Sequence, residues 1–497
     1  MDFIKNFPFF SIMLSMFAGI VSSVLPGRAA KWVNRVVITA VGVLSLVLLL
    51  YLLGTGESYV YMMGHFPAPW GNEIRAGVLE AGMALFFCII MLLSMLGGAH
   101  KLLTEVAEEK QNLYYILVNL LLSSLLALVY TNDIFTAYVF VEINTITACG
   151  LIMIRETGRT IEAAVRYMIM SLLGSGLLLL GLCVLYDLTG HLLMSNMKEQ
   201  VAYLAANHLY SMPLLVTIGL ISSGLAIKSA LFPFHAWLPD AYGYSTASSA
   251  AMLSSLVSKG YIFLLIKLIY RVFGFEVFHD SHIINVLFVF GLMGMIFGSL
   301  SAIRENDIRR MVAFSSVAQI GYIFMGIGMG TQVAMVASVF HILSHAATKS
   351  LLFISAVGLS DVSGGSRKFE DLTGAGYRDP CAGVTFTAGA LSMVGVPLFS
   401  GFISKLLFAQ AAVQNSGKML PALIVLGIST ILNAIYFMKT VIRLYTPVDT
   451  VYESGGQLVN RKLYVLTLIG FIILNIVLGV NSQPIVDMIG QGLGMFA

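Results

Sequence analysis

The sequence predicts an all-α polytopic membrane protein with about 14 transmembrane helices. Hydrophobic residues make up 58% of the 497 residues and charged residues only 11%. Apolar runs of roughly twenty residues recur from end to end, and this is the length that a helix needs to cross a hydrocarbon core of ~30 Å. The alternating pattern of a transmembrane barrel strand is absent, so helices are the expected way to satisfy backbone hydrogen bonds in lipid.

Fourteen apolar stretches are expected to span the membrane. They lie near residues 8–25, 33–53, 78–98, 113–130, 132–153, 163–185, 211–230, 246–270, 284–303, 311–329, 332–358, 382–411, 420–443 and 463–481. No cleavable signal peptide is expected, because the first stretch follows a short polar start and no small-residue cleavage motif comes after it.

Lysine and arginine in the connecting segments fall almost wholly in the odd-numbered loops. Those loops carry Arg28, Lys31, Arg35, Lys101, Lys110, Arg155, Arg159, Arg304, Arg309, Arg310, Arg367, Lys368, Arg378, Arg461 and Lys462. The even-numbered loops carry about one each, namely Arg75, Lys198, Arg271 and Lys418. By the positive-inside rule we expect a multi-pass protein of the cell inner or plasma membrane, with the odd loops in the cytoplasm and both termini outside.

Proline interrupts two of the expected spans, at Pro233, which lies two residues before His235, and at Pro397. A proline inside a helix removes a hydrogen bond and clashes with the preceding turn. In lipid the freed backbone groups need protein or water around them. The two interruptions lie five helices apart and each has a lysine nearby, Lys228 and Lys405, which is the pattern of an inverted-repeat transporter. Two simple packing kinks are the alternative.

These interruptions predict a division of the chain into four parts, with one broken helix in each five-helix repeat. The parts are N-terminal transmembrane helices at 1–112, a first inverted repeat at 113–270, a second inverted repeat at 284–443 and a C-terminal transmembrane helix at 444–497.

Ionisable residues also lie deep inside the apolar stretches, where a charge is costly and is by default evidence for a proton relay or an ion path. There are seven of them: Glu142, Lys228, Lys259, His341, His345, Lys349 and Lys405. Glu142 and Lys228 have comparable depth and are expected to pair. Steps of four residues from His341 to Lys349 place three side chains in one stripe about 12 Å long. Seven such residues of mixed sign predict a pathway.

A pathway of this composition suits proton movement. A desolvated lysine prefers to be neutral and a nearby carboxylate restores its charged form, so separation of Glu142 from Lys228 would push the lysine's proton onward. Histidine titrates near neutrality and passes protons in both directions. We expect protons to charge Lys228, to pass Lys259 and the histidine stripe, and to leave through Lys405. The structural alternatives are a static Glu142–Lys228 pair that fixes helix register and a Lys405 side chain that reaches the membrane interface.

The residues around these charges form three motifs, at 137–144 (AYVFVEIN), 228–241 (KSALFPFHAWLPDA) and 395–405 (GVPLFSGFISK). Together with Lys259 and the 341–349 stripe, they make the chain resemble the antiporter-like proton-translocating subunits shared by respiratory complex I, Mrp cation/proton antiporters and membrane-bound energy-converting hydrogenases. The resemblance covers essentially the whole chain. It implies a fourteen-helix core with two inverted repeats, and a central polar axis on which the matching glutamate and lysines handle protons.

Two departures narrow the resemblance. One branch of complex I places glutamate where this chain has Lys405. We also expect no C-terminal extension able to form the long lateral helix of the largest complex I paralogue. A compact form with this lysine is most similar to the D-type Mrp subunit or to its counterparts in hydrogenase-like complexes.

The resemblance further implies a subunit that works with other membrane subunits and moves protons, with exchange for sodium left open. The cysteines Cys88, Cys149, Cys183 and Cys381 show no metal or redox spacing, so we expect no cofactor in this chain. If electrons drive the pump, redox chemistry belongs to peripheral Fe–S, hydrogenase or flavin-containing partners. The alternatives are a stand-alone secondary solute transporter and a polytopic membrane enzyme, although the sequence lacks a catalytic constellation. It also lacks the basic stripe that nucleic acid binding requires.

Overall fold

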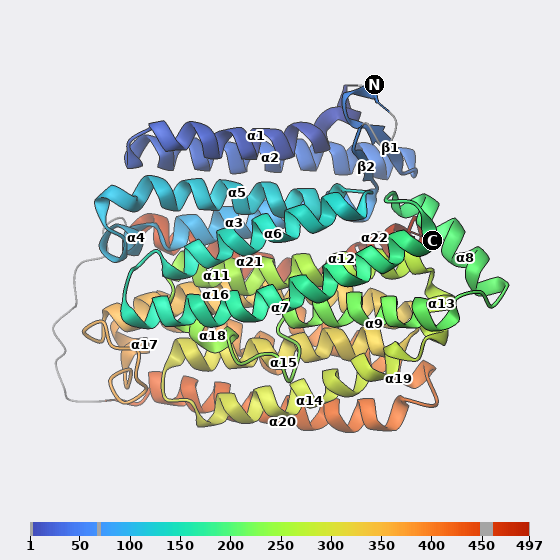
Figure 1. Cartoon of the computed structure of the whole chain (residues 1–497). Helices are drawn as coiled ribbons and strands as arrows, with labels where there is room; N and C mark the ends of the chain where they lie inside the picture. The colour runs from blue at the N-terminus through green and yellow to red at the C-terminus, as the bar shows by residue number, and fades with distance from the viewer. Residues whose placement is uncertain (1–2, 67–70, 448–460, 497) are drawn as a thin grey trace.

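The computed structural model of the protein describes residues 3–66, 71–447 and 461–496, and its long helices lie side by side in one bundle (Figure 1). Within these residues, 13 helices are long and apolar enough to cross a membrane. The bundle therefore has the all-helical architecture that the sequence predicts.

The first half of the chain contains one small β-hairpin, and its other elements are helical. Its elements are η1 (Ile4–Asn6), α1 (Phe7–Val24), α2 (Gly27–Thr55), β1 (Tyr59–Met62), η2 (Met63–His65), β2 (Glu73–Ala76), α3 (Val78–Gly97), α4 (Ala99–Glu105), η3 (Glu108–Lys110), α5 (Gln111–Tyr130), α6 (Ile134–Met153), α7 (Gly158–Thr189), α8 (Met194–Ala206), α9 (Ser211–Lys228) and α10 (Leu238–Tyr244). The strands β1 and β2 pair antiparallel, with Tyr59 opposite Ala76 and Met62 opposite Glu73.

The second half is helical throughout its described residues. Its elements are α11 (Ala247–Met252), η4 (Leu253–Val257), α12 (Ser258–Leu268), η5 (Ile269–Phe273), α13 (Phe275–Asp280), α14 (Ile283–Arg304), α15 (Ile308–Met329), α16 (Gln332–Asp361), α17 (Ala375–Arg378), α18 (Pro380–Val394), α19 (Ser400–Gln414), α20 (Met419–Leu444), α21 (Arg461–Val480) and α22 (Ser482–Gly494).

The predicted spans are confirmed with one refinement. Thirteen of them each coincide with a helix that is long and apolar enough to cross a membrane. The remaining stretch, 382–411, consists of two shorter helices, α18 and α19, which are separated at residues 395–399. Pro397 lies in this gap, and the other predicted break follows α9, which ends at Lys228. The inverted relation between 113–270 and 284–443 stays a prediction.

Two helices form the centre of the bundle. The continuous helical segment α11–η5 and the helix α16 are 100% buried over their most apolar 18-residue windows, whereas the same measure is 28% for α20 and 33% for α21. The segment α11–η5 contains π-helical turns at Leu253–Val257 and Ile269–Phe273, on either side of α12. Single π turns inside helices are frequent at functional sites. The outer helices expose the apolar side chains that lipid requires.

Side-chain caps begin two of the helices that carry candidate residues. The Asp133 carboxylate accepts a hydrogen bond of 2.6 Å from the backbone N–H of Thr136 at the start of α6. The Thr331 hydroxyl accepts one of 3.2 Å from Ala334 at the start of α16. Such caps satisfy backbone donors that have no partner within the helix, so they define where these helices begin.

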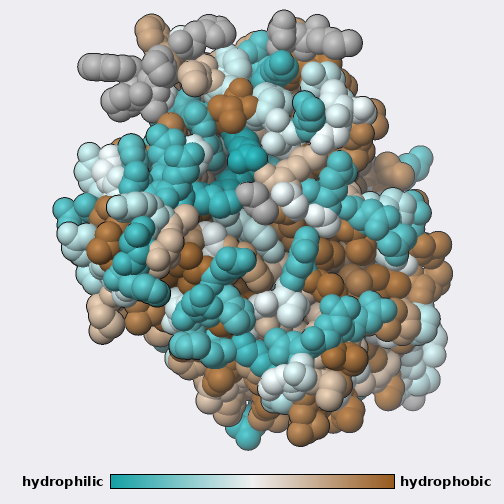
Figure 2. Space-filling model, turned by 90° about the vertical axis from the view of Figure 1, so that its right-hand side faces the viewer, coloured by the Kyte–Doolittle hydropathy of each residue, from teal (hydrophilic) through white to brown (hydrophobic). Residues whose placement is uncertain are grey.

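The basic loops gather at one end of the bundle. Lys101, Arg155, Arg309 and Arg367 come from four different odd-numbered connections and line one cavity there. The hairpin, α8, α13 and both chain ends lie at the opposite end (Figure 1). Figure 2 shows that opposite face, where hydrophilic residues gather over the surface and hydrophobic residues follow its flank. The alternation of loops therefore agrees with the predicted topology, and which face meets the cytoplasm stays a prediction.

The sequence-based prediction that Arg271 lies in a loop is wrong. This residue lies in the π turn η5, is 2% exposed, and forms an ion pair with the fully buried Glu80 of α3. Its guanidinium carbon also lies 4.1 Å from the centroid of the Phe496 ring. Hydropathy along one segment does not reveal a partner on a distant helix, and this pair lets the central helix remain buried one turn beyond the predicted end.

Lys267 is a second buried cation that the sequence-based prediction did not include, although it lies in the same apolar stretch as Lys259. Its ammonium group donates to the carbonyls of Leu128 (2.9 Å), Val129 (2.8 Å) and Thr131 (2.6 Å) at the end of α5. A lysine has three donors, and all three are used here. A cation at the C-terminal end of a helix also complements the helix dipole. Lys267 therefore anchors α5 to the central helix.

Replacement of Lys267 by methionine should destabilise the protein by roughly 2–3 kcal/mol, because three buried carbonyls would lose a charged donor. The measurement is the midpoint of thermal unfolding of the purified chain in detergent, followed by tryptophan fluorescence. Lys462→Met is the matched control, since Lys462 is exposed. Equal midpoints for the two variants would contradict the anchoring role.

Candidate functional site

The seven predicted residues come from five helical elements, which are linked across the bundle directly or through α7 and η4. Glu142 is on α6, Lys228 on α9, Lys259 on α12 and Lys405 on α19, while His341, His345 and Lys349 are all on α16. The contacts between α9 and α12, between η4 and α16, and between α16 and α19 carry the succession across the bundle. We call this set of seven residues the charged row.

The charged row begins with the predicted ion pair. The Lys228 ammonium lies 3.5 Å from a carboxylate oxygen of Glu142. The Ser175 hydroxyl on α7 donates to the same carboxylate oxygen. The lysine side chain is fully buried, whereas the glutamate side chain is 26% exposed. The pair therefore joins the interior of the bundle to its outer surface.

Close packing of α7 on α9 positions this lysine. A Cβ added at Gly174 would lie 2.8 Å from the carbonyl oxygen of Gly224 and 3.0 Å from Cγ of Lys228. A Cβ at Gly224 would in turn lie 2.6 Å from the carbonyl oxygen of Gly174. Small residues at such crossings let two membrane helices approach closely, and here they leave room for the lysine stem between them.

Hydroxyl and amide groups lead inward from the ion pair. The Lys228 ammonium donates to the Thr145 hydroxyl at 2.8 Å, which lies 3.3 Å from the hydroxyl of Tyr261. The Tyr261 hydroxyl donates to the side-chain oxygen of Asn144 at 3.0 Å. Tyr261 belongs to α12, as Lys259 does, so a chain of polar contacts links the ion pair to α12.

Lys259 is fully buried and finds its partners on its own helix. Its ammonium donates to the backbone carbonyl of Ser254, which belongs to the π turn η4, and to the Ser258 hydroxyl at 3.2 Å. The Ser254 hydroxyl lies 3.1 Å from that of Ser316 on α15. The polar contacts thus continue from α12 to α15.

Lys349 of α16 also contacts α15. Its ammonium donates to the carbonyl of Val312 at 2.9 Å and to the Ser315 hydroxyl. Ser315 is adjacent in the chain to Ser316, the residue reached from the central helix. Two serines on one turn of α15 therefore stand between the two buried lysines Lys259 and Lys349.

The two histidines stack one turn apart on α16, with ring centroids 5.9 Å apart. One nitrogen of His341 shares a hydrogen bond with the Ser404 hydroxyl on α19. Its other nitrogen and both ring nitrogens of His345 have no partner among the described residues. A small cavity of about 10 Å³ adjoins both rings together with Gln319 and Lys405. A space of this size with polar walls suits about one water molecule, which would satisfy these nitrogens.

Lys405 lies at the second helix break. Its ammonium donates to the carbonyl of Val394, the last residue of α18, at 2.7 Å, and lies 5.9 Å from the ring centroid of Tyr322. The next residue, Gly395, has a φ of +94°, and a Cβ there would lie 3.0 Å from Cδ of the lysine. The break thus supplies both an unused helix carbonyl and the space that the lysine occupies.

Asn475 is a polar residue of this region that the sequence-based prediction did not include. Its side-chain oxygen on α21 accepts hydrogen bonds from Thr348 (2.8 Å), Ser392 (3.1 Å) and Ser400 (2.9 Å). These three hydroxyls belong to α16, α18 and α19. The available signal was an amide in the middle of the apolar stretch 463–481, which indicates a hydrogen bond to another helix without identifying that helix.

The predicted break residues have different surroundings. His235 is half-buried in the irregular segment after α9 and stacks on Phe232, with ring centroids 5.3 Å apart. One of its nitrogens has no partner in the described parts of the chain. No hydrogen bond joins His235 to the charged row within these parts. Pro233 and Pro397 lie outside any helix, so they define breaks without contributing polar groups.

Metal ligands are not grouped in the described part of the chain. No set of three or more His, Cys, Asp or Glu side chains there is arranged to hold a metal ion. The cysteines at 88, 149, 183 and 381 are all unpaired.

Similarity to known proteins agrees with this geometry. The model of the family described as "NADH:quinone oxidoreductase/Mrp antiporter, TM" matches residues 131–432. NADH-quinone oxidoreductase subunit N of Desulforudis audaxviator is 34% identical over 393 residues, which cover 78% of this chain and 76% of the relative. The D-type subunit of the Na⁺/H⁺ antiporter of Alkalihalophilus pseudofirmus is 25% identical over 428 residues, or 86% of this chain and 84% of the relative.

Solved structures share the fold over nearly the whole chain, and each comes from a multisubunit membrane complex. A chain of the membrane-bound sulfane sulfur reductase, an archaeal respiratory complex, has a TM-score of 0.87 and 26% identity, covering 100% of this chain and 98% of its own. A chain of the Mrp complex from Dietzia sp. has a TM-score of 0.86 and 23% identity, covering 99% and 97%. A chain of complex I from Thermus thermophilus has a TM-score of 0.74 and 21% identity, covering 97% and 100%. The chain belongs to the NADH:quinone oxidoreductase/Mrp antiporter family, as an antiporter-like membrane subunit.

Proposed function

We propose that this subunit carries protons across the bundle along the charged row, from the Glu142–Lys228 pair through Lys259 and α16 to Lys405. The observation that carries the proposal is the succession of buried and half-buried titratable groups with hydroxyls beside them, and the histidine nitrogens that have no partner among the described residues. Buried groups that serve packing alone normally have all their hydrogen bonds satisfied. Three ring nitrogens of His341 and His345 have no partner among the described residues, and both rings adjoin the small cavity.

Glu142, at the surface end of the charged row, is the residue on which a charge from a neighbouring subunit acts. Glu142 holds the ammonium of Lys228 in its charged form by direct attraction. Since the glutamate is partly exposed on the bundle surface, a charge brought to it by a neighbouring subunit weakens that attraction. The lysine then gives up a proton to the hydroxyl chain through Thr145. Movement of one charge through 100 mV involves ~2.3 kcal/mol, which is within the range that formation and loss of a buried ion pair supplies.

The inner groups relay the proton. The Ser316 hydroxyl contacts that of Ser254, and the Ser315 hydroxyl accepts from Lys349. Both serines donate to the Val312 carbonyl, so reorientation of their hydroxyls, which can both donate and accept, completes the relay between Lys259 and Lys349. Histidine does the same through its two nitrogens, and one water in the adjoining cavity would connect them with Lys405. The ammonium group of Lys405, the last lysine of the row, donates a hydrogen bond to a single carbonyl, that of Val394. Release of a proton from Lys405 therefore breaks few contacts.

A stand-alone solute transporter is the weaker interpretation. A small-molecule site commonly encloses about 300–1,000 Å³. The cavity within the charged row is about 10 Å³, which accommodates a water and no organic solute.

The basic end of the bundle is proposed to face the cytoplasm and both termini the outside. The support is the gathering of the odd-numbered loops at one end, combined with the positive-inside rule. External labelling of a cysteine introduced at either terminus reports this orientation directly.

Replacement of Lys228 or Lys405 by methionine should reduce proton translocation at least about tenfold, equivalent to ~1.4 kcal/mol or more at the limiting step. Methionine keeps the length of the side chain and removes the exchangeable protons. The measurement is acidification or alkalinisation of proteoliposomes that contain the assembled complex, followed with a pH-sensitive dye. Lys462→Met is the control for an exposed lysine, and undiminished translocation in both the Lys228 and the Lys405 variant would exclude the proposed path.

Replacement of His345 by phenylalanine should also lower proton translocation by about tenfold or more while the complex still assembles. The ring is retained, and no hydrogen bond to the described protein is lost because neither nitrogen has a partner there. The exposed His208→Phe variant is the matched control. If His345→Phe translocates protons normally, His345 is a packing residue and the relay does not pass through it.

The host complex decides what drives the protons, and we propose that it contains further membrane subunits. Mild-detergent purification of the tagged chain, with mass spectrometry and metal analysis, separates two outcomes. Fe–S subunits, with nickel or flavin, indicate a redox-driven complex. Small membrane subunits without metal indicate an Mrp-type antiporter, in which sodium exchange is then measured directly. Recovery of the chain alone, still active in solute uptake, would contradict both.

A further inference from the structure

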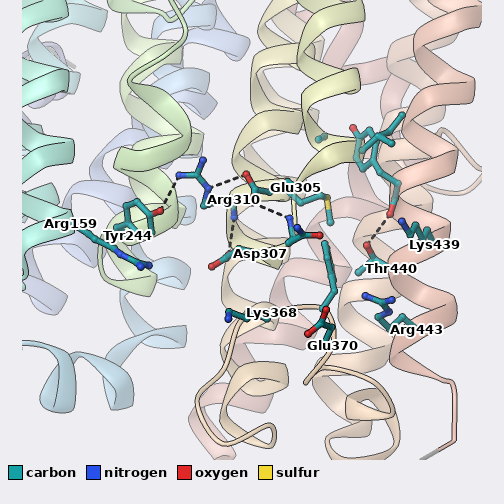
Figure 3. A pocket seen from close by; sticks show the side chains of 16 residues that line it. Arg159, Tyr244, Glu305, Asp307, Arg310, Lys368, Glu370, Lys439, Thr440 and Arg443 are labelled. Carbon is teal, nitrogen blue, oxygen red and sulfur yellow. Dashed lines mark hydrogen bonds and ion pairs between the residues drawn. The ribbon is translucent and has the colours of Figure 1, made fainter.

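A cavity of about 470 Å³ opens at the basic end of the bundle, away from the charged row. It lies between the ends of α14 and α20, with side chains from α7, α15 and the connection after α16 completing its walls (Figure 3). Its volume is that of a typical ligand site. The family membership of the chain assigns it no role.

Positive charge dominates the walls of this cavity. Four of the lining cations, Arg159, Lys368, Lys439 and Arg443, have no ion-pair partner among the described residues. Figure 3 shows them around one space, with Lys439 and Arg443 on α20 and Lys368 on the facing loop. Their charge is available to an anion that enters the cavity.

Two of the three carboxylates in the walls already form ion pairs with arginines. Glu305 pairs with Arg310 at 3.0 Å, and Asp307 pairs with Arg367 at 3.4 Å. Glu370 is the one lining carboxylate without an ion pair among the described residues. Four available cations face one available carboxylate, so the cavity has an excess of positive charge. A phosphate group, with several strong acceptor oxygens, matches this donor set.

Apolar stripes lead from the membrane to this cavity. On α20, exposed isoleucines at 424, 428, 431 and 435 follow one face, and Lys439 comes one turn later on that face. On α14, which packs against α20, Met293, Phe297 and Leu300 are exposed in the same way and lead to the lining residue Ile303. Chains of hydrocarbon along these stripes would end where the cations begin. A water-soluble anion would have no use for the stripes.

We propose that this cavity binds the phosphate head group of an anionic phospholipid, with Lys439 and Arg443 as its principal cations and the acyl chains along α14 and α20. Basic pockets between membrane helices on the cytoplasmic side recognise lipid head groups in this way. The lipid then joins α20 to the connection after α16, the helix that carries three residues of the charged row.

The test is native mass spectrometry of the full-length chain in detergent, titrated separately with phosphatidylglycerol and phosphatidylcholine. The wild-type chain should bind phosphatidylglycerol more tightly, and the double variant Lys439→Gln/Arg443→Gln should bind it about tenfold more weakly or worse, since each basic residue near the head group contributes several-fold to the affinity. The matched control is Arg28→Gln/Lys462→Gln, which removes two exposed cations from the same end of the bundle outside the cavity. If the double variant is unstable, Lys439→Gln alone is used, because Lys439 is exposed.

Four results would overturn the assignment. The first is equal affinity of the wild-type chain for the two lipids, and the second is an equal loss in the cavity and control variants. The third is displacement of phosphatidylglycerol by millimolar glycerol phosphate, which would assign the cavity to a soluble phosphate compound instead. A loss of partner subunits from the double variant, without a change in lipid binding, would assign it to a protein contact.

Discussion

The constraint on which this structure depends is the cost of holding an ammonium group away from water. Each deeply buried lysine has a specific set of partners: a carboxylate and a hydroxyl for Lys228, a carbonyl and a hydroxyl for Lys259 and for Lys349, and three carbonyls for Lys267. An isolated charge in hydrocarbon would be far less stable. The lysines differ in how many of their three ammonium N–H groups have a hydrogen-bond partner. Lys267 donates to three carbonyls and acts as an anchor, whereas each lysine of the charged row has only one or two hydrogen-bond or ion-pair partners.

Irregular backbone supplies many of these partners. The carbonyl that holds Lys259 belongs to a π turn, the one that holds Lys405 ends a broken helix, and those that hold Lys267 end α5. In a regular helix these carbonyls would be used by amide groups one turn further on. In these three places a lysine lies next to irregular backbone or to a helix end. The breaks therefore supply hydrogen-bond acceptors to cations, in addition to changing the direction of the helices.

The sequence predicts the parts of this arrangement that have a strong local signal. Apolar length predicts the spans, proline predicts both breaks, and the four-residue spacing of His341, His345 and Lys349 predicts their common stripe. Comparable depth is enough to predict the Glu142–Lys228 pair. Arg271 and Asn475 could not be found in the same way. The partners of Arg271 and Asn475 lie on helices far away in the chain, and hydropathy within one segment carries no information about them.

Asn475 has a consequence for how the bundle moves. Its one amide oxygen receives hydroxyls from α16, α18 and α19, so three helices share a single point of attachment on α21. A shift of either half of the broken helix relative to the histidine-bearing helix must stretch at least one of these bonds. The two halves of the broken helix are therefore tied to each other and to α16 through α21, so a relative shift of one of them changes the hydrogen bonding of the others.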